Sequence, residues 1–423
     1  MPTDKNFNAL KAELTALEDR LTTLERMKLP QTLGKLEESR DTLVRRLDEL
    51  SGIGKAAALV VAVLIAITGI NTVNYNKYEA VKKEAFEVLI DLFENRIGDT
   101  VDRISFLDPS EEQTYRIMAM TSTQKLLRDM EISNTKFELR SRLADVIRVV
   151  IESGKEGVAK EQLSSLAIDA AEDRYVLARV LTLQAMMRIR ANPQRRDCDD
   201  ETQSLAKKAL SKDPGVGAAY NIVGVCLTNR AAVSIQNGSS LRDSARELQE
   251  GIGYYDLASA LKPTDWTWSR NFNNKVSAAE QFLVATLGPN RSDSAQMDTA
   301  LAATYYQTFD NFVSTSLREV GLSQQLGPSH PGHIETEAEL HGLRWLYYSG
   351  KHDSKAAGDA YTAEKEKFQK AVKAGLYAKQ TNYQAIIEGI CGDPKTNKQP
   401  DPLLSNMCGD REVLAWIRDA VPR

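Results

Sequence analysis

The sequence predicts an all-α protein with an N-terminal coiled coil, one transmembrane helix and a long array of helical hairpins. Three observations lead to this prediction. Only 13 prolines and 24 glycines interrupt the 423 residues, so long stretches rich in Ala, Leu, Glu and Lys run between helix breakers. Leucines near the N-terminus follow the three-four spacing of a heptad. The chain carries no charge between Lys55 and Lys77.

The overall charge gives no reason to expect binding to nucleic acid. The chain has 54 Lys and Arg against 58 Asp and Glu, a formal net charge of -4. Hydrophobic residues make up 42% and charged residues 26%, as in ordinary globular proteins. We therefore predict neither a largely disordered chain nor a transporter with many spans.

Residues 5–50 are predicted to form a coiled-coil stalk. A first seam consists of Phe7, Leu10, Leu14, Leu17, Leu21 and Leu24. A second seam follows Pro30, with Arg40 at one position where the heptad calls for an apolar residue. The break at Pro30 allows a bent stalk or a helical hairpin. We interpret the stalk as a site of self-association into a homo-oligomer; the alternative is an amphipathic helix pair packed on the rest of the protein.

Residues 56–76 are predicted to cross a membrane once. At about 1.5 Å per residue, a helix of this length spans roughly the 30 Å hydrocarbon core of a bilayer. The alternative is a buried core helix, because Asn71, Thr72 and Asn74 dilute the apolar character of its end. Lys and Arg are balanced on the two sides, so the positive-inside rule gives no orientation. We expect the charged N-terminus in the cytoplasm and the C-terminal helical domain on the other side.

Beyond the predicted span, apolar residues keep the spacing of amphipathic helices. Residues 77–172 are predicted to be a helical region. Breakers such as Gly154 and Pro193 separate the helices at hairpin lengths. The pattern therefore predicts a series of antiparallel helices.

A recurring pattern appears in residues 173–290. One helix ends with Ala206, Ala209, Leu210, Asp213 and Pro214, and the next carries Tyr220, Val223, Gly224 and Leu227. A second ending has Tyr255, Ala258 and Pro263. This pattern resembles the tetratricopeptide repeat (TPR) family, whose helix pairs stack into an α-solenoid. The resemblance implies close helix approach at the small residues and a role in binding proteins or peptides.

The repeat pattern is not regular throughout. Pro214 and Pro263 are 49 residues apart, about 15 more than one 34-residue repeat, and Ile235 to Ser244 is the expected inserted loop. Residues 291–390 are predicted to form further hairpins that resemble the family more loosely. Residues 391–423 are predicted to be a C-terminal loop and helix.

Four cysteines are too few for a disulfide-rich scaffold. Cys226 lies in an apolar run and is predicted to be a small buried hydrophobe. Cys391 and Cys408 each begin a Cys-Gly-Asp triplet. Two interpretations of this pair remain as alternatives. The two cysteines form a loop-closing disulfide in an oxidising compartment, or they are free thiols in two turns.

No motif predicts catalysis or a cofactor. All four histidines lie in the segment His330–His352, and His333, Glu337 and His341 have the spacing of one helix face. The two outer histidines would nevertheless be about 12 Å apart along a helix, too far to bind one metal ion together. We therefore expect no enzyme activity, no cofactor and no metal.

The sequence as a whole favours a membrane-anchored TPR-like scaffold or adaptor. Its partner is expected to be a protein or peptide, bound by polar positions such as Asn221 and Arg230 on the first helix of the best-matched repeat. One alternative is a ligand-sensing signalling or membrane-effector protein. A second is a metal-dependent enzyme that uses the His330–His352 segment.

Overall fold

A computed structural model describes residues 75–104, 111–152, 154–191, 198–261, 266–287, 293–304, 306, 308–326, 330–378, 380, 382–393 and 399–421. The predicted coiled coil of residues 5–50 lies outside them, as does the predicted span 56–76 except for its last two residues. Among the helices that are described, none is long and apolar enough to cross a bilayer.

The described part of the chain contains fifteen α-helices, one short 3-10 helix and no β-strand, which confirms the all-α prediction. The helices are α4 (Tyr75–Arg103), α5 (Glu111–Asp129), α6 (Thr135–Ile151), α7 (Glu156–Asp169), α8 (Arg174–Ala191), α9 (Asp200–Lys212), α10 (Gly217–Gln236), α11 (Leu241–Leu261), α12 (Trp266–Thr286), α13 (Ser294–Ala302), α14 (Phe309–Leu326), α15 (Pro331–Gly350), α16 (Ser354–Lys373), α17 (Tyr383–Cys391), η1 (Ser405–Met407) and α18 (Arg411–Ala420).

The chain divides into two compact units. The first consists of Met1–Phe93 and Lys125–Ser133, and the second of Glu94–Gln124 and Asn134–Arg423. Helices α4 and α5 each contribute to both units. The described residues of the first unit bury a set of large apolar side chains, namely Phe86, Leu89, Ile90, Phe93, Leu127 and Met130.

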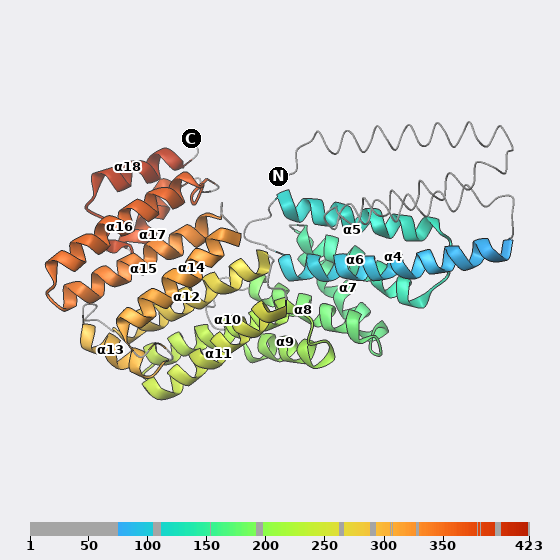
Figure 1. The fold of residues 1–423 in the computed structure, drawn as a ribbon, viewed down its shortest axis with the longest axis horizontal. Coiled ribbons are helices and arrows are strands. Elements are labelled where there is room, and N and C mark those ends of the chain that lie inside the picture. The colour runs from blue at the N-terminus through green and yellow to red at the C-terminus, as the bar shows by residue number, and fades with distance from the viewer. Residues whose placement is uncertain are drawn as a thin grey trace, which may run out of the picture. The chain divides into compact units, whose positions relative to one another are not determined.

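Within the second unit, helices that follow one another in sequence pack as pairs. The pairs α6–α7, α8–α9, α10–α11 and α15–α16 are in direct contact, and α12 packs against α10, α11, α14 and α15 (Figure 1). This arrangement confirms the prediction of a helical-hairpin array. Pairing of neighbours is expected where short turns join amphipathic helices, because each helix buries its apolar face on the next.

Short polar side chains begin many of these helices. Asn134 accepts a hydrogen bond from Phe137 N at 3.1 Å, and Asp353 accepts one from Ala356 N at 3.0 Å. Such caps satisfy backbone N–H groups that have no partner within the helix. They fix where each helix starts, and therefore which side chains face the neighbouring pair.

Two apolar cores hold the C-terminal half of the second unit. One contains Tyr255, Phe282, Phe309, Phe312, Leu343 and Leu403, contributed mainly by α11 to α15. The other contains Phe368, Ile386, Leu404, Met407, Val413 and Ile417, contributed mainly by α16 to α18. Adjacent residues Leu403 and Leu404 belong to different cores, so the segment before η1 connects them.

All four cysteines form disulfides. Cys391 pairs with Cys408, the first of the two alternatives left open by the sequence. Cys226 is fully buried, as predicted, but it pairs with Cys198 and is not simply a small hydrophobe. The sequence could not show this pair, because only the packing of α10 on the turn before α9 brings residues 28 positions apart together.

Candidate functional site

Two arginines connect successive hairpins through equivalent contacts. Arg140 on α6 donates to the carboxylate of Asp173, just before α8. Arg179 on α8 donates to Asp213 at 2.7 Å, just before the turn that leads into α10. The two pairs are separated by 33 and 34 residues, so the contact recurs at the length of one hairpin. We call these contacts the arginine joints.

The arginine joints are largely removed from water. The Arg140 side chain is 5% exposed and that of Arg179 is 9% exposed. Arg140 also pairs with Glu94 on α4 at 2.5 Å. Breaking a buried ion pair costs far more than breaking an exposed one, because the remaining charge is left without a partner in a poorly solvated place. The joints therefore fix the angle between hairpins.

Tyr175 lies between the two guanidinium groups. Its ring centroid is 3.4 Å from Arg179 Cζ and 5.1 Å from Arg140 Cζ, distances typical of cation–π contacts. Its hydroxyl donates to the backbone oxygen of Glu94. Burial raises the pKa of Tyr175 far above its usual value, so the ring stays neutral at physiological pH. Tyr175 thus links the two joints into one rigid network.

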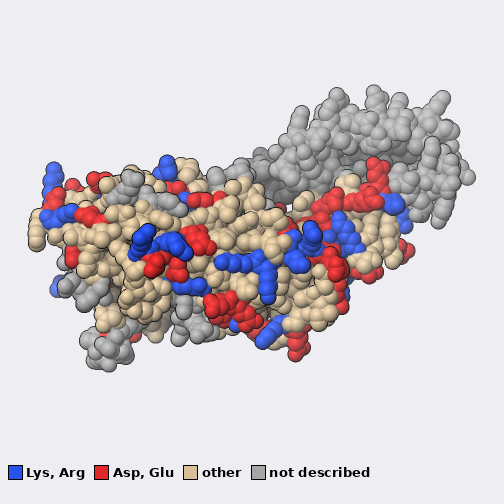
Figure 2. Space-filling model, turned by 90° about the horizontal axis from the view of Figure 1, so that it is seen from below, with Lys and Arg blue, Asp and Glu red and all other residues tan. Residues whose placement is uncertain are grey.

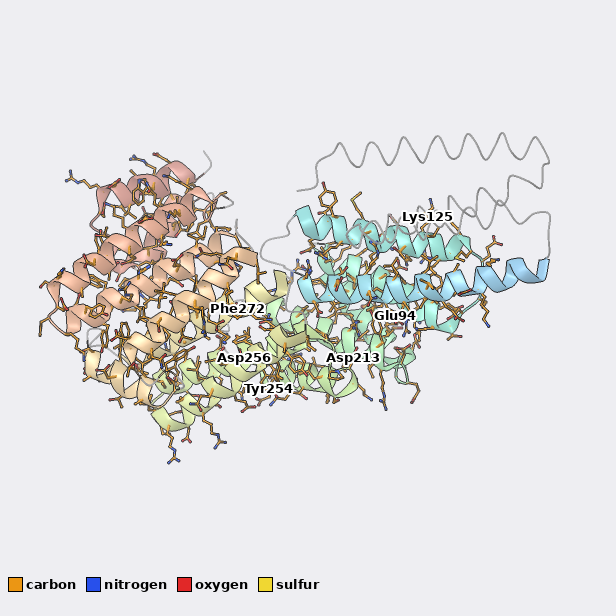
Figure 3. All side chains as sticks on the ribbon, viewed as in Figure 1. Glu94, Lys125, Asp213, Tyr254, Asp256 and Phe272 are labelled. Atoms are coloured by element: carbon orange, nitrogen blue, oxygen red, sulfur yellow. A yellow bond between two sulfur atoms is a disulfide. The ribbon has the colours of Figure 1, made fainter. Side chains whose placement is uncertain are left out.

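A second polar network crosses α10, α11, α12 and α14, and we call it the polar ladder. Asn274 on α12 donates to Asn221 on α10 at 2.9 Å. Lys275, the next residue on α12, pairs with Asp256 on α11 at 2.8 Å and with Glu319 on α14 at 3.5 Å. Figure 3 shows Asp256 on α11. The ladder places amide, ammonium and carboxylate groups together along consecutive helices.

Aromatic and apolar side chains also lie on α10 and α11. The rings of Tyr220 and Tyr254 lie 6.2 Å apart between centroids. Burial, and then the nearby charge of Glu250, raise the pKa of Tyr254. Leu257 and Leu261 on the same helix as Tyr254 are exposed; Figure 3 labels Tyr254 on α11 and Phe272 on α12. Tyr254 packs against the apolar cluster that contains Ile222 and Leu227.

The two residues predicted to face a partner do not form one site. Asn221 bonds to Asn274 on α12, whereas Arg230 bonds to Gln203 on α9 at 3.0 Å and pairs with Asp200 at 3.3 Å. Nine residues turn a helix by about two and a half turns, which puts the two side chains on opposite sides of α10. Only Asn221 belongs to the polar ladder.

The histidine segment is used for packing. His333 and His341 are buried on α15. Burial lowers the pKa of each imidazole to about 4. The neighbouring His330 lowers the pKa of His333 further toward this value, and Arg344 does the same for His341. His341 Nδ1 lies 3.1 Å from Arg344 Nη1. In the described ranges, no three His, Cys, Asp or Glu side chains are grouped to hold a metal ion.

Charges of both signs are interspersed on the described part of the face seen in Figure 2. In the view of Figure 2, Lys and Arg side chains lie among Asp and Glu side chains, and neither sign forms a continuous field. Many of these charges are paired across or along helices, as in Lys351–Asp298 and Lys370–Glu366. A partner that binds by long-range charge attraction alone does not fit this face.

Sequence reasoning missed the arginine joints. Asp213 was noted only as part of a repeat ending, and Arg140, Asp173 and Arg179 were not singled out. A usable signal was present, because Arg140 and Arg179 are each followed by an aspartate one hairpin later, at separations of 33 and 34 residues. Recognising it requires knowing which helices are neighbours.

Searches of protein-family models, of curated proteins and of solved structures returned no match to this chain.

Proposed function

We propose that this chain is a membrane-anchored, TPR-like scaffold that binds a protein or peptide partner with the side of the hairpin array that carries the polar ladder. The observation that carries the proposal is the recurrence of the same arginine joint at separations of 33 and 34 residues. A joint repeated at this period is suited to stack helix pairs in one register, as repeat scaffolds do.

The polar ladder supports the choice of face. It contains hydrogen-bonding groups from α10, α11, α12 and α14, and helical repeat proteins bind extended ligands on a surface to which several successive helices contribute. Asn221 and Asn274 each keep part of their side chain accessible. Amide groups on a rigid support suit recognition of a peptide backbone, because they donate and accept hydrogen bonds at fixed positions.

The N-terminal residues supply the rest of the proposal. The predicted span would fix the hairpin array at a membrane, and the predicted coiled coil would cluster several copies. Clustering raises the effective concentration of the binding faces and so increases avidity without new contacts. The two disulfides support placing the hairpin array in an oxidising compartment, outside the cytoplasm.

Site-specific photocrosslinking in cells tests the binding face. A photoreactive residue replaces Asn274 in one variant and Lys207, exposed on α9, in the control variant. We expect a discrete crosslinked partner from position 274 and none from position 207. Equal labelling from both positions would exclude the polar ladder as the binding face.

Protease protection in sealed vesicles tests the anchor separately. We expect the hairpin array to be protected on one side of the membrane and the N-terminal segment to be cleaved on the other. A chain released from vesicles without detergent would overturn the anchoring part of the proposal. The ligand-sensing alternative differs in one measurable way, because it requires the oligomeric state to change when ligand binds.

A further inference from the structure

The C-terminal segment Asp401–Ala420, here called the C-terminal clasp, is packed tightly on α15 and α16. A Cβ atom added to Gly342 on α15 would lie 2.0 Å from the backbone oxygen of Leu403, so only glycine permits this approach. Leu403 enters one core and Leu404 the other. The clasp therefore contacts α15 through its backbone as well as through its side chains.

Carboxyl groups are concentrated where the clasp packs. Glu280 on α12 and Glu364 on α16 are fully buried. Neither oxygen of Glu280 has a hydrogen-bond partner among the described residues, and the same holds for Oε1 of Glu364. The other oxygen of Glu364 accepts a hydrogen bond from Asn406 of the clasp at 2.5 Å. Glu335 and Glu339 on α15 and Asp401 of the clasp interact electrostatically with this pair or with each other.

These carboxyl groups act on one another without a compensating cation in the described part of the chain. Burial and the charge of Asp401 together raise the pKa of Glu364 to about 8, against the opposing hydrogen bond from Asn406, and that of Glu335 to about 7. Burial and neighbouring carboxylates also raise the pKa values of Glu280 and Glu339. A carboxylic acid in such a place keeps its proton at a pH where an exposed one has lost it.

The basic groups nearby are engaged elsewhere. Lys367 pairs with Glu337 at 2.7 Å, and Lys365 pairs with Asp410 at 2.7 Å and Glu412 at 2.8 Å. Other titratable or charged groups on the surrounding elements are Glu319 with Lys275, His341 with Arg344, and Glu366 with Lys370. Three tyrosines also interact with the buried carboxyl groups, namely Tyr306 with Glu280, Tyr361 with Glu364, and Tyr377 with Glu335 and Glu339. None of these cations contributes to the electrostatics of Glu280 or Glu364.

We propose that the C-terminal clasp is a pH-sensitive contact, held on α12, α15 and α16 while the buried carboxyl groups carry protons and loosened when they ionise. Ionisation places the charge of Asp401 opposite those of Glu280, Glu339 and Glu364. The Cys391–Cys408 disulfide keeps the loosened clasp near its binding surface, so the change is reversible. This device is independent of the polar ladder and of any partner.

The direction of the effect follows from proton linkage. An exposed glutamate in the unfolded chain loses its proton near pH 4.3, whereas the buried ones keep theirs to higher pH. Between these values the folded state binds more protons, so the stability of the clasp falls as pH rises. Below about pH 4 both states are protonated and these groups contribute no further change.

Hydrogen exchange of the full-length chain in detergent, without reductant, tests the proposal. Protection factors are measured at pH 5.5 and 8.5, with the intrinsic exchange rate divided out. We expect protection in η1 and α18 to fall by about 10-fold or more relative to α10, since each pH unit over which a proton is retained changes the equilibrium about tenfold. An unchanged ratio of clasp to α10 protection would overturn the proposal.

Two variants separate the buried carboxyl groups from general effects of pH. The double variant Glu280→Gln/Glu364→Gln, which cannot ionise at these positions, is expected to show a smaller change than the parent chain, and Glu335 and Glu339 account for what remains. The control Glu366→Gln, on the exposed face of α16, is expected to behave like the parent chain. A double variant with the full parental response would refute the assignment. If loss of protection in α10 shows that the double variant does not fold, Asp401→Asn replaces it. The proposal then requires that Asp401→Asn reduce the change in clasp protection between pH 5.5 and 8.5.

Discussion

Gly224 on α10 faces the ring of Tyr255 on α11. A Cβ atom on Gly224 would lie 2.7 Å from Cε1 of that ring. The Tyr255 hydroxyl lies 3.3 Å from Thr228 Oγ1, one turn further along α10. Gly251 makes the reciprocal approach, because its added Cβ would lie 3.1 Å from the backbone oxygen of Gly224. The two helices are therefore fixed in register by two glycines and one tyrosine.

Gly224→Ala is expected to lower the free energy of unfolding by about 1–3 kcal/mol, because the added methyl group overlaps the buried Tyr255 ring. Gly253→Ala on α11 is the matched control, since nothing lies within 4 Å of its added Cβ. It should stabilise the protein by about 0.5–1 kcal/mol through helix propensity. Urea unfolding curves measure both changes, and equal effects would contradict the close approach.

Arg179→Ala is expected to cost about 1–3 kcal/mol, because it removes the buried partner of Asp213, whose side chain is 25% exposed and keeps the hydrogen bond from Gly215 N. Arg142→Ala serves as the control, since the Arg142–Asp169 pair at 2.7 Å is 47% and 45% exposed. Exposed pairs contribute at most about 1 kcal/mol. A double-mutant cycle with Asp213→Ala isolates the pair. A coupling energy near zero would show that the arginine joint is not energetically important.

Reduction of the disulfides is expected to destabilise the second unit. Closing a loop of about 15 residues stabilises a protein by about 3 kcal/mol in the chain-entropy account, and these disulfides close loops of 17 and 28 residues. Scanning calorimetry of the Cys391→Ser/Cys408→Ser variant should show a lower Tm, and addition of reductant should lower it further. Peptide mapping without reductant checks the pairing: a Cys391–Cys198 crosslink would disprove it.

Asp410→Asn is expected to make the free energy of unfolding less dependent on pH in the acid range. Hydrogen bonds from Lys365 at 2.7 Å and Tyr361 at 2.9 Å hold the pKa of Asp410 below its usual value. A depressed pKa contributes stability above about pH 4 that is lost as pH falls through the folded-state value. The variant should lose about 1–2 kcal/mol at pH 6 and change less than the parent between pH 5 and 2. A variant whose stability changes between pH 5 and 2 as much as that of the parent would contradict this role of Asp410.

The local structure of the chain was predictable to a useful degree. The apolar spacing and the breakers predicted helices arranged as hairpins, and the small residue Gly224 was expected at a close approach. The expected loop Ile235 to Ser244 was too long, since α10 ends at Gln236 and α11 begins at Leu241. The pairing of Cys391 with Cys408 was one of two open alternatives. These features depend on residues within one hairpin or one loop, where sequence spacing translates directly into distance.

The candidate site was less predictable. Asn221 and Arg230 were chosen as two polar positions on one helix, yet they contact α12 and α9 respectively. The Arg179–Asp213 joint depends on the packing of successive pairs, and the Lys275–Glu319 contact depends on α12 lying against α14. The identity of a side chain does not by itself predict which helix packs against the face that carries it.

The sequence by itself determined that the described chain is helical and which residues allow two helices to approach. Only the tertiary structure decided that Cys226 meets Cys198, that Asp173 and Asp213 receive successive arginines, and that Glu280 is buried near Glu339 and Asp401. The physical reason is range. Helix formation depends on hydrogen bonds and side chains within about four residues, whereas the ionisation of a carboxyl group depends on burial and charges contributed by helices distant in sequence.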